Sequence, residues 1–193
     1  MSIDRAAALA LVHEWTPSES LRKHMLAVET VMRAYARHFG ADEEAWGLAG
    51  LLHDFDYERF PNDAHSATEE HPSHGVRHLR SLGVSDEICD AVMGHADYTR
   101  TPRVSLMARA LFAVDELVGL VTAATYVRPS KSILDLEASS VKKKMKDKGF
   151  ARGVSRDDIT AGAAELGVEL DPHIAFVIEA MKANASVLGL AGL

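Results

Sequence analysis

The chain has 193 residues, of which 47% are hydrophobic and 25% are charged, a balance typical of a globular protein rather than a disordered one. The formal net charge of −7 argues against a general binder of nucleic acid or of an anionic membrane surface. A single cysteine, Cys89, excludes an internal disulfide framework and cysteine-based zinc sites. Histidine is unusually frequent, with ten residues, so any bound metal ion would be held by imidazole and carboxylate groups.

The first residues do not resemble a targeting segment. Asp4 places an acid where a signal peptide carries basic residues, and His13 and Glu14 interrupt the run of alanine and leucine. No uncharged apolar stretch reaches the length of about 18 residues that a membrane-spanning helix needs. We therefore expect a cytoplasmic protein without a membrane segment.

Helix start and stop signals organise the first half of the chain. Ser18 or Ser20 can cap a helix that runs to about residue 38, with Gly40 as its stop. Asp42 can cap a second helix that ends near residue 52. The polar residues 56–70 predict a loop. Three more helices are expected, over residues 72–82, 85–96 and 104–125.

The second half is also expected to be helical. Arg128, Pro129 and Ser130 break the long apolar helix, and a basic helix is expected over residues 141–148. Further helices are expected over residues 155–166 and 171–188. No segment alternates convincingly enough to predict a strand. The prediction is an all-α protein: one domain over residues 1–193, a bundle of about seven or eight helices. Its metal-binding core would span residues 20–130, with a helical extension over residues 131–193.

Six residues stand out. Apart from the adjacent pair His53 and Asp54, each of them falls on, or at the end of, a different expected helix. In chain order they are His24, His53, Asp54, His74, His95 and Asp115. A helical bundle can direct one side chain from each helix to a common interior point, and imidazole with carboxylate suits iron, manganese, nickel or zinc. The alternative is that these polar groups hydrogen-bond one another and cap helix ends.

This ordered pattern resembles the HD-domain superfamily of metal-dependent phosphohydrolases, over about residues 20–130. The central motif of that superfamily matches Leu51-Leu52-His53-Asp54. The resemblance implies that His24, His53, Asp54 and Asp115 hold one metal ion. It implies that His74 and His95 hold a second ion, with Asp54 bridging both.

The resemblance also implies the cofactors and the activity. Two divalent transition-metal ions (iron, manganese, nickel, cobalt or zinc, with magnesium as a further option) would activate a hydroxide that attacks a phosphate ester or phosphoanhydride. His53 and Asp54 would form the catalytic centre. The expected partner is a small phosphorylated substrate, with no nucleic acid and no membrane, and a homo-oligomer is left open.

Two neighbouring positions need a choice between roles. Asp56 could protonate a leaving group or order a water molecule, or it could be a polar residue at a helix end. His71 competes with His74 for the role of metal ligand. Since Pro72 suits the first turn of a helix, His74 falls inside that helix and His71 outside, so His74 is the predicted ligand.

The substrate is less clear than the site. The spacing resembles most the branch of bacterial symmetrical diadenosine tetraphosphatases, and there Arg128 or Lys131 would contact a substrate phosphate. The residues that follow Asp54, Phe55 to Glu58, depart from the usual pattern of these relatives, so the substrate is not transferred. Lysines within residues 142–148 either contact a polyanion or form an exposed helix face.

Two other functions are compatible with the same residues. Some HD-like proteins with the same ligands are diiron oxygenases, and a regulatory module that binds a metal ion or a nucleotide without turnover is a third class. Relatives that use oxygen separate the fourth histidine from the final aspartate more widely than His95 and Asp115 are separated here. This spacing favours hydrolysis.

Overall fold

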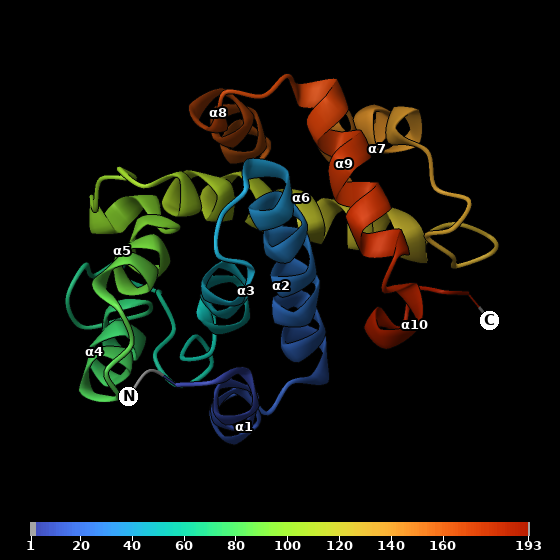
Figure 1. Ribbon diagram of the computed structural model, residues 1–193. Coiled ribbons are helices and arrows are strands. Elements are labelled where there is room, and N and C mark those ends of the chain that lie inside the picture. Colours follow the sequence, from blue (N-terminus) through green and yellow to red (C-terminus); the bar gives the residue numbers. More distant parts are fainter. Residues whose placement is uncertain (1–2, 193) are drawn as a thin grey trace. The chain divides into compact units, whose positions relative to one another are not determined.

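The computed structural model describes residues 3–192, and over this range the chain is helical and has no strand (Figure 1). One isolated bridge joins Ser132 and Ala191. The all-α prediction is therefore confirmed. The described residues form ten α-helices, two more than the eight segments expected: the first, α1, was not predicted, and the last predicted helix is divided in two. No helix in this part of the chain is both long and apolar enough to cross a membrane.

The chain folds as two compact units that divide between Phe112 and Ala113, within helix α6 (Leu106–Tyr126). The first unit contains α1 (Arg5–Trp15), α2 (Glu19–Phe39), α3 (Glu43–Leu52), α4 (Ser73–Ser81), α5 (Asp86–Gly94) and a 3-10 turn, η1 (Asp97–Thr99). The second contains α7 (Ala138–Met145), α8 (Arg156–Leu166), α9 (Leu170–Lys182) and α10 (Ala185–Leu188).

The helix ends follow the capping signals of the sequence. The Ser18 hydroxyl accepts a hydrogen bond from the backbone of the first turn of α2, and Gly40 ends that helix at a φ of 67°, a conformation that costs glycine little. Asp42 caps α3 and Ser155 caps α8 in the same way as Ser18. Asp4 caps α1 through its carboxylate. Side-chain caps of this kind typically stabilise a helix by about 1 kcal/mol each.

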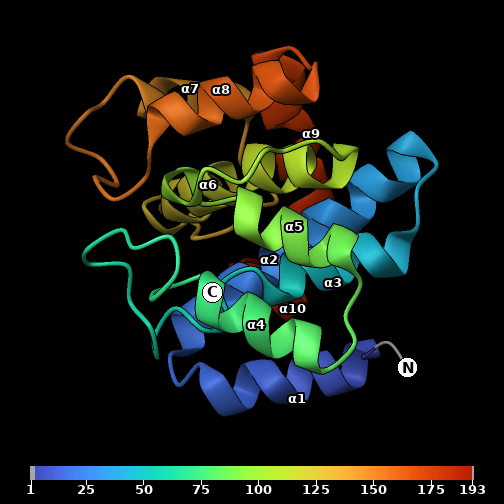
Figure 2. The same cartoon turned by 90° about the vertical axis from the view of Figure 1, so that its left-hand side faces the viewer.

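In the first unit, α3 packs closely along α2, and α4 packs against α5 (Figure 2). The closest approach is at Gly50, where an added Cβ would lie 2.8 Å from the Cα of Glu29 on α2. Only glycine lets two helix backbones come this near. The close approach brings the C-terminal end of α3 beside α2, and both helices carry predicted site residues.

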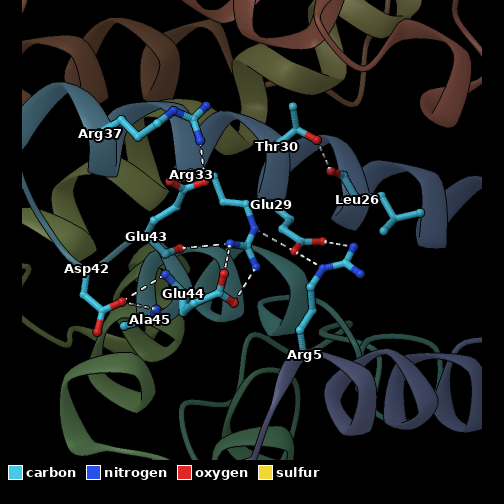
Figure 3. Close-up of polar contacts among 10 residues, drawn as sticks. All are labelled: Arg5, Leu26, Glu29, Thr30, Arg33, Arg37, Asp42, Glu43, Glu44 and Ala45. Carbon is cyan, nitrogen blue, oxygen red and sulfur yellow. Dashed lines mark hydrogen bonds and ion pairs between the residues drawn. The ribbon is translucent and has the colours of Figure 1, made fainter.

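A buried carboxylate ties three helices of this unit together (Figure 3). Glu29 accepts hydrogen bonds from Arg5 of α1, at 2.5 and 2.9 Å, and from Arg33 of its own helix, at 3.0 Å. Arg33 also donates to both oxygens of Glu44 on α3, at 2.7 and 3.0 Å. Because Glu29 is buried, its charge is tolerated only while these arginines surround it.

In the second unit, α9 packs against α7, α8 and α10 (Figure 1). His173 of α9 is buried, and its Nε2 donates to the backbone carbonyl of Ala113 at 2.9 Å. Burial lowers the pKa of His173, so this histidine is a neutral structural group. Gly162 of α8 also packs closely against Ala113, since a Cβ added at Gly162 would lie 2.6 Å from the Cα of Ala113.

The Glu29 network gives the first prediction. Glu29→Gln keeps the size of the side chain but removes the charge that two arginines share, so the free energy of unfolding should fall by about 2–4 kcal/mol. The lower end of this range applies because Arg5 is half-exposed and can return to water. Urea denaturation followed by circular dichroism measures the change.

Glu19→Gln is the matched control, since Glu19 is an exposed carboxylate in an i, i+4 pair with Lys23. Such surface pairs contribute little, so its denaturation midpoint should stay near that of the wild type. Equal midpoints for the two variants would contradict the structural role given to Glu29.

Candidate metal centre

The carboxylate of Asp54 is surrounded by four histidine rings. Its Oδ2 lies 3.3 Å from Nε2 of His53 and 3.9 Å from Nε2 of His24. Its Oδ1 lies 3.3 Å from Nε2 of His71 and 3.5 Å from Nε2 of His95. Each oxygen of the Asp54 carboxylate therefore faces two histidine rings.

Each ring comes from a different segment of the first unit. His24 lies in α2, His53 is the C-terminal cap of α3, and His95 is the C-terminal cap of α5. His71 lies in the irregular segment just before α4. The close packing of α2 and α3 brings the rings of His24 and His53 to a centroid distance of 5.2 Å. The cluster therefore depends on packing between elements that are far apart in the sequence.

Backbone carbonyls fix which nitrogen of the histidine rings carries the proton. Nδ1 of His53 contacts the carbonyl of Gly50 at 2.8 Å, and Nδ1 of His95 contacts the carbonyl of Val92. A carbonyl only accepts hydrogen bonds, so in each ring Nδ1 must be the donor. In a neutral ring, Nε2 then presents its lone pair toward Asp54. Metal-binding histidines typically donate the N–H of the other ring nitrogen to such an acceptor.

His71 is oriented in the same way by a carboxylate. Its Nδ1 contacts Oδ1 of Asp56 at 2.7 Å, so its Nε2 also faces inward. The Nε2 atoms of His71 and His95 lie only 3.2 Å apart, and both face Oδ1 of Asp54. A proton on one ring would satisfy only one of these contacts, whereas a divalent cation between the three atoms would satisfy all of them. The donor set therefore fits a metal ion.

Asp54 itself is ionised. Burial alone would raise its pKa, but His53 beside it, together with His95 and His71, lowers the pKa well below its usual value. A carboxylate whose two oxygens each face a separate group of imidazoles can serve two metal ions at once. Ligand atoms of Asp54, His71 and His95 all lie within 4.8 Å of one another, close enough to share one ion.

The structure places His71, and not His74, among the side chains that converge on Asp54. His74 stacks its ring on Phe60, with centroids 3.9 Å apart and planes 4° apart, and it is not in the group of converging ligand atoms formed by the described residues. The helix begins at Ser73, one residue after the predicted start, with Pro72 as its N-cap. The segment before the helix, rather than its first turn, enters the cluster.

Backbone contacts hold His71 in this position. Its N–H donates to the carbonyl of Phe60 at 2.7 Å, and its carbonyl accepts from the hydroxyl of Tyr98. Burial raises the pKa of Tyr98 to about 12, so this hydroxyl keeps the proton that it donates. Both ends of the His71 peptide are therefore fixed, although the residue belongs to no helix.

The hydrogen bonds of Asp56 also differ from those expected of a general acid. Its Oδ1 accepts from Nδ1 of His71, and its Oδ2 accepts from the backbone N–H of Gly75 at 2.6 Å. Asp56 is buried, with both oxygens engaged, so its contacts are those of a positioning residue for His71. In the sequence, the features that correspond to this role are the position of Asp56, two residues after Asp54, and the glycine at position 75.

Three predicted site residues belong to the second unit. Asp115 lies on α6 beyond the division between the units. Arg128 donates from Nε to Asp135 Oδ1 at 2.9 Å, and that hydrogen bond raises the pKa of Arg128. Lys131 is exposed, in a left-handed conformation with a φ of 48°. The roles of Asp115 as a metal ligand, and of Arg128 and Lys131 as phosphate ligands, stay predictions from the sequence.

The first unit is thus a helical unit in which histidines from several segments converge on one aspartate and could hold a metal ion. The family model of the HD domain matches residues 21–126, more than half of the chain. The chain therefore belongs to the HD-domain family, whose members are generally metal-dependent phosphohydrolases. A search of curated proteins and a search of solved structures each found no match.

Gly75 provides a test of how His71 is held. A Cβ at this position would lie 2.7 Å from Cγ of Asp56 and 2.8 Å from Cε1 of Phe55, so Gly75→Ala should displace the Asp56 carboxylate. Loss of a residue that orients a metal ligand typically costs about 10–100-fold in metal affinity. Titration of the metal-free protein with Mn²⁺ or Zn²⁺ measures this loss.

The matched control is Gly153→Ala, since a Cβ at Gly153 meets nothing within 4 Å. This variant should bind the metal as the wild type does. Unchanged metal affinity in a folded Gly75→Ala protein would rule out the positioning role of Asp56.

Proposed function

We propose that the protein is a metal-dependent hydrolase of phosphate esters or phosphoanhydrides in nucleotides or small phosphorylated metabolites. The observation that carries the proposal is the convergence of imidazole Nε2 atoms on the ionised carboxylate of Asp54, with Nδ1 of His53, His71 and His95 held from behind. Membership of the HD-domain family supports the same reaction class.

In this proposal each oxygen of Asp54 serves a different metal ion. One ion would be held by His24, His53, Asp54 and Asp115, and the other by Asp54, His71 and His95. His71 replaces His74 in the ligand set that the sequence predicted. Divalent ions in such a site lower the pKa of a bound water and polarise a phosphoryl oxygen.

The charges of the proposed ligands favour an anionic substrate. Four neutral histidines and two aspartates offset only about half of the charge of two divalent ions. The site would keep a net positive charge of about two, which matches a phosphate dianion. Asp54 contributes its ionised form at neutral pH, and Asp56 keeps the Nε2 lone pair of His71 directed inward.

The choice of His71 over His74 is tested by metal content. His71→Ala should lower the metal content of the purified protein by about one ion per chain, because it removes one ligand of a predicted two-ion site. His74→Ala should leave the content unchanged, because His74 stacks on Phe60 instead. Elemental analysis of both variants, with unfolding curves to confirm folding, measures the difference. The reverse result would restore His74 as the ligand.

The reaction class is tested with a panel of phosphate monoesters, nucleotides, dinucleoside polyphosphates and phosphodiesters. The assays use protein of measured metal content, supplied in turn with Mn²⁺, Fe²⁺, Co²⁺, Ni²⁺ and Mg²⁺. We expect phosphate release from at least one class, and a loss of at least about 100-fold in Asp54→Asn, which removes the shared anionic ligand.

Two outcomes would contradict the proposal. Oxygen consumption by the iron-loaded protein, without phosphate release, would indicate an oxygenase. Tight binding of a nucleotide, with no turnover by the metal-loaded protein on any substrate of the panel, would indicate a regulatory module.

A further inference from the structure

The second unit contains a cavity of about 430 Å³, which is within the size range of small-molecule sites. One wall is apolar and comes from the end of α6 and the segment after it, where Ala124, Val127 and Leu136 line the cavity. The opposite wall comes from α7. All of the lining residues belong to the second unit.

The wall from α7 is one face of that helix. Ser140, Lys143 and Lys144 of α7 line the cavity, with Asp147 just beyond the end of the helix, and the spacing of three and four residues in the helix is that of a single stripe. Two adjacent lysines thus face the same space as the apolar wall. Arg128, from the turn after α6, adds a third cationic side chain to the lining.

The lysines of α7 differ in how their charge is balanced. Lys142 pairs with Asp171 of α9 at 2.6 Å. Lys143 and Lys144 line the cavity, and within residues 3–192 neither of them has an ion-pair partner. The one acid in the lining, Asp147, accepts a hydrogen bond from the N–H of Gly149 at 3.0 Å. In a chain of net charge −7, the lining thus carries more cationic than anionic side chains.

The loop between α7 and α8, beside these lysines, is held by hydrogen bonds. Arg156 donates from its guanidinium to the carbonyls of Phe150, at a short distance, of Ala151, at 2.6 Å, and of Val154, at 2.7 Å. These bonds fix the chain between α7 and α8. The ring of Phe150 lies 4.5 Å from Nζ of Lys144, a cation–π contact that limits the positions of this ammonium group. The ammonium group of Lys144 is therefore restricted in position at the cavity.

We propose that this cavity binds a small molecule that carries a phosphate group on an apolar body. The ammonium groups of Lys143 and Lys144 would pair with the phosphate oxygens, while Arg128, whose Nε donates to Asp135, would add to the local positive potential. The surface of Ala124, Val127 and Leu136 would contact the apolar body. The proposal goes beyond hydrolysis at the metal centre, because it assigns the second unit a ligand site of its own.

The test uses phenylphosphonate, which has a dianionic group on an aromatic ring and a carbon–phosphorus bond that a phosphatase does not hydrolyse. Methylphosphonate is the matched ligand, with the same charge and almost no apolar body. Binding to the full-length protein is measured by calorimetry. The position of the ligand is read from the methyl NMR signals of Val127 and Leu136.

The variants are Lys143→Gln/Lys144→Gln and the control Lys146→Gln/Lys148→Gln, which removes the same charge from exposed residues outside the lining. We expect phenylphosphonate to bind the wild type and the control alike, and to bind the Lys143/Lys144 variant at least about tenfold more weakly. We also expect methylphosphonate to bind the wild type more weakly than phenylphosphonate does.

Three results would overturn the proposal. They are an equal loss of affinity in both double variants, wild-type binding that leaves the signals of Val127 and Leu136 unmoved, and no binding to the wild type at all. The second result would place the ligand elsewhere, for example at the metal centre, and would leave the proposed hydrolase activity intact. Conversely, failure of the hydrolysis assays would not affect the cavity, since the probe is not a substrate.

Discussion

Several electron-rich atoms share one small volume in the first unit, and they can do so only around positive charge. Nε2 atoms of four histidines lie within 3.9 Å of an oxygen of Asp54, and two of these nitrogens are 3.2 Å apart. Backbone carbonyls and Asp56 take the opposite nitrogen of three rings, which sets the inward-facing tautomer. The candidate metal centre and the proposed reaction both depend on this arrangement.

Much of the first unit serves to bring these atoms together. Gly50 lets α3 approach the backbone of α2, so that His53 comes beside His24. The buried carboxylate of Glu29 links α1, α2 and, through Arg33, α3. Gly75 leaves space for Asp56, which in turn holds His71. Each of these contacts lies outside the ligand set, yet the geometry of the ligands depends on it.

The sequence predicted helix positions well, because capping is local. Ser18, Gly40 and Asp42 mark helix ends through contacts within one turn, and such contacts leave a pattern in neighbouring residues. Helix α1 was missed because its alanine-rich stretch was weighed only as a targeting segment, although Asp4 caps it. The last helix was expected to be continuous, but the chain turns between α9 and α10 at residues 183 and 184.

The sequence predicted the positions of some of these side chains but not of others, and the difference has a physical cause. His24, His53, Asp54 and His95 come together as expected, since their order reflects successive helices. The choice of His74 assumed that a ligand belongs inside a helix. His71 is held instead by Asp56, fifteen residues away, and by Tyr98. Hydrogen bonds across an irregular segment leave no periodic signal, so the sequence alone could not show them.

Anomalous X-ray diffraction from crystals of the metal-loaded protein, recorded at the absorption edge of the bound ion, tests the central claim most directly. The account predicts an anomalous peak within bonding distance of Asp54 and of Nε2 of both His71 and His95, with the ring of His74 still on Phe60. A peak bonded to His74 but not to His71, or no peak near Asp54 in metal-loaded crystals, would contradict it.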